Sequence, residues 1–136
     1  IPTVRSTGYR LTRVQAGAML PDYVNEMGLD GHPDLFVAIA QEGRPIYESP
    51  VQQDSPHATW TPTSTFVFVE PNAKLVVSVW DKDVSDNDRV LAIEIPATAL
   101  ATGRVEFATQ VGSYVRLFFE PRKNSQFPSA AKGTAR

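Results

Sequence analysis

Several segments of the chain place apolar side chains at every second position, a period that is typical of half-buried β-strands. Leu75, Val77 and Val79 share one side of such a segment, and in another Phe66 and Phe68 lie opposite two valines. A continuous apolar run, residues 35–40, is also short enough for a strand. The segments predicted to be strands on this basis are residues 35–40, 65–69, 74–80, 90–95 and 115–119.

Weaker strand patterns occupy residues 9–16, 44–48 and 104–107. Stretches rich in Gly, Pro, Asn and Asp separate the segments, as expected for tight turns. Short strands at this spacing predict an all-β fold, an eight-stranded antiparallel β-sandwich. Helix is expected only as single turns at residues 22–27 and 97–101, each following a proline.

Composition fits one domain with a real core, because the chain has 136 residues of which 42% are hydrophobic. We divide it into an N-terminal extension (1–8), the sandwich (9–121) and a flexible basic tail (122–136). The tail carries four basic residues and no acid, so the net charge of −2 for the whole chain leaves −6 for the rest. An acidic body argues against nucleic acid as a partner. The absence of cysteine excludes disulfides and thiolate metal sites.

Four aspartates follow the segment 74–80 within a short stretch: Asp81, Asp83, Asp86 and Asp88. Like charges this close repel one another, so the loop either stays open to water or holds a cation. Asp81 and Asp83 are alternate residues, and an extended backbone points both side chains to the same side. Their carboxylates could share one ion, with Asp88, or failing that Asp86, closing the loop from its other end.

Calcium takes roughly six to eight oxygen ligands from carboxylates, carbonyls and water. The backbone carbonyl of Lys82 could face an ion held by the neighbouring aspartates, and Asp34 could approach from a second loop if the sandwich makes the two loops neighbours. Oxygen ligands favour calcium or magnesium over zinc. The competing interpretation is that Asp and Asn are common turn formers, and that Arg89 neutralises the acidic loop.

Four stretches occur in an order known from one family. They are Leu20-Pro21 followed by Gly-His-Pro-Asp-Leu-Phe-Val at residues 31–37, then Phe-Val-Phe at 66–68, then Val-Trp-Asp-Lys-Asp at 79–83. From residue 9 to residue 121 the chain resembles a C2 domain, the calcium- and phospholipid-binding sandwich of the synaptotagmin and protein kinase C type. It departs from the family at Gly28, where the first acidic ligand usually stands, while Asp30 precedes Gly31 instead. The resemblance is therefore to a divergent member.

The resemblance implies a non-catalytic module that binds phospholipid membranes when calcium is present. In such domains calcium bridges the loop carboxylates to anionic phospholipid headgroups, and apolar loop tips enter the membrane interface. Val84, Met27 and Leu29 are the candidate tips, although Met27 and Leu29 could instead pack beneath their loop. The residues expected to hold calcium are Asp30, Asp34, Asp81, Asp83, Asp86 and Asp88, with the carbonyl of Lys82.

An enzyme is not expected. The two histidines, His32 and His57, are far apart in sequence, and no nucleophile or phosphate-binding motif accompanies them. The alternative to membrane binding is a calcium-independent module that docks on protein within a larger assembly. The sequence leaves the compartment open, and peripheral membrane attachment is expected if the calcium-dependent function holds.

Overall fold

The computed structural model describes residues 6–19, 33–82 and 87–121 of the chain. Nine strands and one 3-10 helix make up this part: β1 (Thr7–Gly17), β2 (Leu35–Gln41), β3 (Arg44–Glu48), β4 (His57–Trp60), β5 (Thr65–Val69), β6 (Lys74–Lys82), β7 (Asn87–Pro96), η1 (Ala97–Thr102), β8 (Arg104–Ala108) and β9 (Tyr114–Pro121). The described part of the chain contains no helix with the length and hydropathy needed to cross a bilayer.

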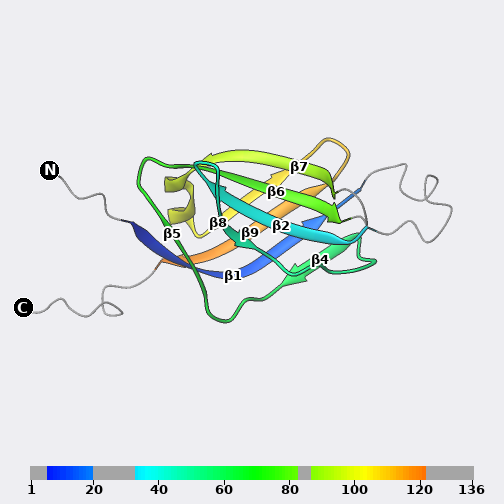
Figure 1. Ribbon diagram of the computed structural model, residues 1–136, viewed down its shortest axis with the longest axis horizontal. Helices are drawn as coiled ribbons and strands as arrows, with labels where there is room; N and C mark the ends of the chain where they lie inside the picture. Colours follow the sequence, from blue (N-terminus) through cyan, green and yellow to red (C-terminus); the bar gives the residue numbers. More distant parts are fainter. Residues whose placement is uncertain (1–5, 20–32, 83–86, 122–136) are drawn as a thin grey trace, which may run out of the picture.

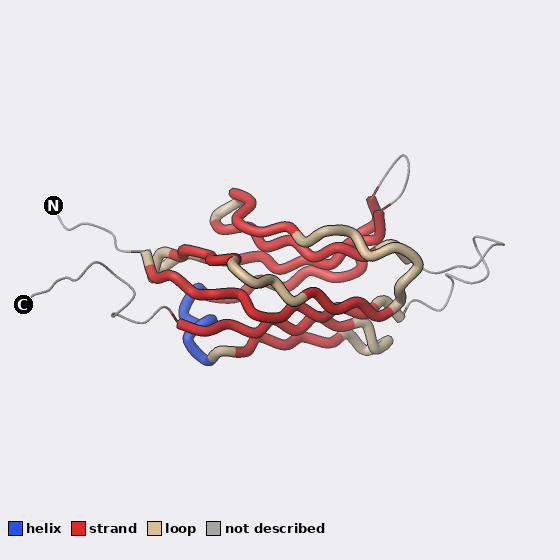
Figure 2. Tube along the Cα trace, turned by 90° about the horizontal axis from the view of Figure 1, so that it is seen from below, coloured by secondary structure: helices blue, strands red, loops and turns tan. Residues whose placement is uncertain are grey.

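Two antiparallel sheets lie face to face (Figures 1 and 2). The first sheet has the order β4-β1-β9-β8, with β5 also paired to β1, and the second has the order β3-β2-β6-β7. β9 pairs along β1 from Tyr9 to Gly17, so β4 and β5 share the opposite edge of that strand. The nine strands thus fill eight sheet positions, and the predicted eight-stranded sandwich is confirmed.

The β4 and β5 strands are separate because the chain leaves the edge of β1 between Trp60 and Thr65. Pro62 lies in this gap, and its ring nitrogen has no hydrogen to donate to a ladder. The sequence pattern predicted β5 at residues 65–69 but not β4. The start of β1 also differs from the predicted boundary at residue 9, because Thr7 already pairs with Val69.

The core lies between the two sheets and is made of the alternate residues that the pattern predicted. Leu75, Val77 and Val79 of β6 are fully buried, and Val115 and Leu117 of β9 contribute to the same core from the other sheet. Each such side chain stabilises the fold by roughly 1.5–3 kcal/mol relative to an exposed one. The predicted two faces of β5 are also confirmed, since its valines are buried and its phenylalanines exposed.

Residues with positive φ form the turn between β2 and β3 and the end of η1. Glu42 and Gly43 both have positive φ, as a two-residue hairpin turn between β2 and β3 requires. The helical turn expected after Pro96 is η1, which ends at Gly103, where φ is 83° and the N–H donates to the carbonyl of Leu100. The turn expected at residues 22–27 lies outside the described residues.

Four strand termini meet at one end of the sandwich. Gly17 at the end of β1 pairs with His57 at the start of β4. Leu35 at the start of β2 pairs with Asp81 near the end of β6. Leu35 also forms a two-way backbone bridge with Gln52 in the connection between β3 and β4. The start of β2, the connection before β4 and the end of β6 are therefore neighbours, and Asp34, Asp54 and Asp81 lie among them.

Candidate metal and membrane-contact site

Asp34 and Asp81 are tied to each other directly. The backbone N–H of Asp34 donates to Oδ1 of Asp81 at 2.9 Å, and the N–H of Lys82 donates to the carbonyl of Asp34 at 2.8 Å. Asp81 is 8% exposed, which is unusual for a carboxylate at a strand end. The condition that the two acidic loops be neighbours is therefore met at Asp34 and Asp81.

A β-bulge decides which residue of β7 lies opposite Asp81. The register shifts by one residue after Val79, so Val90 is left out of the ladder and Asp88 pairs with Asp81. Without this bulge, Arg89 would lie opposite Asp81, where unlike charges attract. The bulge thus replaces a favourable cross-strand pair by two like charges on one face of the sheet. Bulges that re-aim side chains in this way are frequent beside functional sites.

Asp54 belongs to the same cluster and was missed by the sequence analysis. Its backbone N–H donates to Oδ1 of Asp34 at 2.8 Å, and its φ of 52° is one that Asp and Asn adopt more readily than most residues. It lies in the connection between β3 and β4, and the signal that could have found it is the short alternation in His57–Trp60 that follows. We call the cluster of Asp34, Asp54, Asp81 and Asp88 the aspartate end.

Lys82 and Arg89 also lie in the described part of the chain. Lys82 is exposed at the end of β6 and pairs with Asn87, and the role of its carbonyl oxygen stays a prediction. Arg89 pairs with Trp80 in the ladder, and in the described part of the chain it forms no ion pair with Asp88. Among the described residues, no contact between Arg89 and Asp88 supports neutralisation of the loop. The remaining predicted site residues, Asp30, Asp83, Asp86, Val84, Met27 and Leu29, lie outside the described residues.

The oxygen ligands at the aspartate end suit calcium, but the described side chains do not by themselves form a metal-coordination site. Carboxylates and backbone carbonyls are the ligands that calcium prefers. Within residues 6–19, 33–82 and 87–121, however, no three His, Cys, Asp or Glu side chains are arranged to hold a metal ion. Asp34 and Asp81 each accept a backbone N–H at Oδ1, so the backbone itself fixes where these two carboxylates lie.

A comparison with models of protein families matches the C2 domain over residues 12–110. The chain therefore belongs to the C2 domain family, as its sequence motifs implied. The match includes the β2 and β6 strand ends that carry Asp34 and Asp81, and it includes Asp54 and Asp88. A search of curated proteins found no match.

Solved structures with the same fold are distant in sequence. One described as the structure of a C2 domain has a TM-score of 0.61 at 15% identity, covering 85% of this chain and 97% of that one. A C2 domain-containing protein from a putative elicitor-responsive gene has a TM-score of 0.56 at 20% identity, covering 96% and 98%. A calcium-bound structure of two C2 domains of extended synaptotagmin 2 has a TM-score of 0.60 at 16% identity, covering 88% of this chain and 47% of that one. At these identities the likeness shows the fold alone.

Proposed function

We propose that this C2 domain is a non-catalytic module that binds anionic phospholipid membranes through its aspartate end when calcium is present. The observation that carries the proposal is the bulge in β7, which holds Asp88 opposite Asp81 where Arg89 would otherwise stand. Replacing an attractive cross-strand pair by a repulsive one costs stability. A cation bound beside Asp81 and Asp88 would offset that cost. Two structures of extended synaptotagmin 2 share the fold, and one of them is described as calcium bound.

The proposed mechanism is electrostatic. Without metal, the aspartate end is negative and is repelled by an anionic bilayer. Each calcium ion adds two positive charges and offers open coordination positions to lipid phosphates. Calcium and lipid must then raise each other's affinity by the same factor, as thermodynamic linkage requires.

Apolar contact would supplement the ionic bridge. Val84, Met27 and Leu29 are the proposed membrane-contacting residues, and burial of each methylene contributes roughly 0.8 kcal/mol. A few such side chains give weak, reversible attachment, so membrane binding should require calcium rather than proceed through apolar contact alone.

Thermal unfolding with calcium and with chelator tests the metal half of the proposal. An ion that binds only the native state adds about 2.7 kcal/mol at about a hundredfold excess over its dissociation constant. We expect Asp81→Asn and Asp83→Asn to abolish this gain. Glu94→Gln is the matched control, because Glu94 is an exposed acid of β7 that pairs with Val76, far along the ladder from Asp88. Unfolding that ignores calcium in the parent would refute the metal site.

Co-sedimentation with phosphatidylserine vesicles tests the membrane half. The parent should sediment with calcium and stay in solution with chelator, whereas Asp81→Asn should stay in solution in both. Val84→Asp should lose vesicle binding while keeping the calcium-dependent gain in stability. A parent that is stabilised by calcium but never sediments would refute membrane binding and leave the metal site standing.

A calcium-independent protein-interaction module is the second candidate. It is favoured by the fact that Asp34 and Asp81 already serve as structural ties, since both accept backbone N–H donors that hold the strand ends together. In that case the carboxylates act as turn and strand-end caps. Unfolding and vesicle assays would then be indifferent to calcium.

A further inference from the structure

A cavity of about 480 Å³ lies at the edge of the sandwich where the two sheets part. Its walls come from β3, the outer strand of the second sheet, and from β4 and β5 at the outer position of the first. Pro62, which lies in the gap between β4 and β5, is one of the lining residues. The volume falls within the roughly 300–1,000 Å³ that is usual for ligand sites in proteins. None of the described residues proposed above for the metal site lines it.

The lining is aromatic, proline-rich and short of positive charge. Tyr47 and Trp60 supply aromatic surface, and Pro50 and Pro62 supply rigid apolar rings. Glu48 is the charged residue among the described lining residues, which include no lysine, arginine or histidine. Burial raises the pKa of the Tyr47 phenol, so its hydroxyl stays protonated at neutral pH and can donate a hydrogen bond.

Trp60 lines the cavity with atoms other than its indole nitrogen, which has almost no accessible surface. Trp60 is 7% exposed, and among the described residues its Nε1 is a buried polar atom with no hydrogen-bond partner. A buried donor without an acceptor destabilises the fold, and an indole nitrogen can only donate. Trp80, the second tryptophan, is satisfied because its Nε1 donates to Oγ of Ser78 at 2.9 Å.

We propose that this cavity binds an extended, proline-rich and basic segment of a partner protein. Aromatic-lined grooves bind polyproline II segments because that conformation is already extended and its carbonyls are free to accept hydrogen bonds. Proline rings would pack against the aromatic and proline surface of the lining. A lysine or arginine in the segment would face Glu48. The inference does not depend on calcium or on membrane binding.

The chemistry of the lining argues against the anionic ligands that membranes present. A phosphate group entering this cavity would meet the carboxylate of Glu48 and no lining cation. Charge complementarity therefore favours a basic partner over a phosphoinositide headgroup.

The test uses the two indole N–H signals of the ¹⁵N-labelled full chain in an NMR titration. The probe is an acetylated and amidated peptide in which Pro-Pro pairs alternate with single arginines. We expect the Trp60 indole signal to shift and saturate, because this residue lines the cavity, while the Trp80 signal stays in place. A matched peptide with glutamate in place of arginine, and inositol trisphosphate, should leave both signals unmoved.

Two variants locate the site. Thr61→Arg places bulk and positive charge in the cavity wall and should weaken binding of the arginine peptide at least about tenfold. Thr63→Arg is its matched control, because Thr63 is an exposed threonine of the same connection that does not line the cavity. Glu48→Gln should weaken binding about two- to fivefold, as expected for an exposed ion pair. Dispersed spectra establish that each variant is folded.

Three results would overturn the proposal: an unmoved Trp60 signal at millimolar arginine peptide, an equal or stronger response to the glutamate peptide or the inositol phosphate, or binding by Thr61→Arg that equals that of Thr63→Arg.

Discussion

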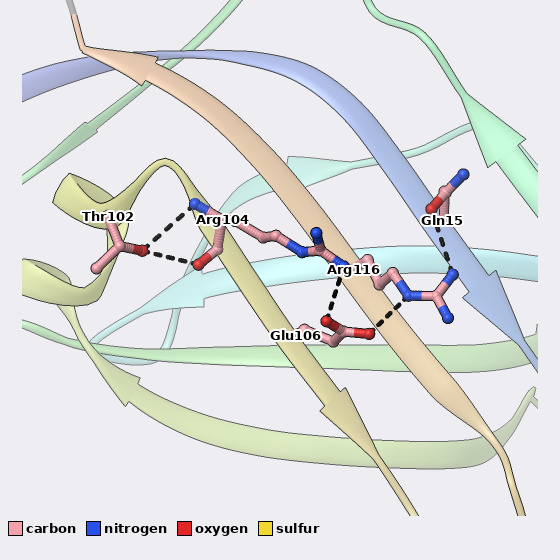
Figure 3. Close-up of polar contacts among 5 residues, drawn as sticks. All are labelled: Gln15, Thr102, Arg104, Glu106 and Arg116. Carbon is pink, nitrogen blue, oxygen red and sulfur yellow. Dashed lines mark hydrogen bonds and ion pairs between the residues drawn. The ribbon is translucent and has the colours of Figure 1, made fainter.

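The outer face of the first sheet and the aspartate end hold their carboxylates in different ways. On the sheet face, Glu106 lies between two arginines (Figure 3): its Oε1 accepts from Nη2 of Arg104 at 2.9 Å and its Oε2 accepts from Nε of Arg116 at 2.8 Å. Arg13 and Arg104 also lie over the ring of Phe118, at 5.1 and 5.2 Å. The hydrogen bond from Arg116, aided by Arg104, holds the pKa of Glu106 below its ordinary value.

At the aspartate end, backbone amides order the carboxylates. Oδ1 of Asp34 accepts from the N–H of Asp54, and Oδ1 of Asp81 accepts from the N–H of Asp34. An amide satisfies an oxygen but cancels no charge, whereas a guanidinium does both. The comparison teaches that the sheet face balances its acid with arginines, while the aspartate end fixes its acids in space through the backbone. A cation that binds at the aspartate end would therefore meet carboxylates that the backbone already holds in place.

The largest effect is expected from Asp81→Ala. This change leaves the N–H of Asp34 without its acceptor in a part-buried contact, so we expect the free energy of unfolding in chelator to fall by about 1–3 kcal/mol. Asp81→Asn keeps an acceptor oxygen and should lose less stability while still losing the response to calcium. Urea unfolding in chelator and in calcium measures both effects.

Glu94→Ala serves as the control for that pair, because a change at an exposed position of β7 should stay within about 0.5 kcal/mol of the parent. If Asp81→Ala in chelator matched the parent, the contact between Asp34 and Asp81 would not order the aspartate end.

A smaller effect of opposite sign is expected from Asp88→Lys. Asp88 pairs with Asp81 across the ladder, so the change turns a repulsive pair into an attractive one. We expect stability in chelator to rise by roughly 0.2–1 kcal/mol and the gain from calcium to disappear. Asp88→Asn should fall between the parent and Asp88→Lys in chelator. Lower stability of Asp88→Lys in chelator, measured by the same urea unfolding, would mean that repulsion between the two aspartates does not control the stability of this strand end.

Alternation of side chains was enough to predict most of the sandwich. In β6, Leu75, Val77 and Val79 are buried where the period of two placed them. Strand β4 was not predicted, because His57–Trp60 is only 4 residues long and its two buried residues give too short a pattern. Pairing with β1 rather than local preference makes it a strand, as is common for β-structure.

The site was predictable only in part. Asp34 was expected to approach Asp81 if the sandwich made their loops neighbours, and the structure shows the two residues in direct contact. Asp54 was missed because its connection leads into the unrecognised strand β4. The bulge at Val90 was also missed, since a strand's register depends on its partner and leaves no mark in its own pattern.

The smallest effect is expected from Glu106→Gln, and it appears as a change in pH dependence. Arg116 and Arg104 lower the folded-state pKa of Glu106 below its ordinary value of 4.5. The stability that Glu106 contributes is therefore present above the unfolded-state pKa and is lost as the pH falls through the folded-state pKa. Between about pH 6 and about pH 3, the melting temperature of Glu106→Gln should fall less than that of the parent.

Salt and calcium sharpen this last prediction. Glu106 is solvent-exposed, so high salt should shrink the difference between Glu106→Gln and the parent. The response to calcium should be unchanged in Glu106→Gln, because its carboxylate is balanced by arginines and lies on the outer face of the other sheet from Asp81. If Glu106→Gln weakened the calcium response as much as Asp81→Asn, the sheet face and the aspartate end would be one coupled electrostatic unit, and the contrast between them would fail.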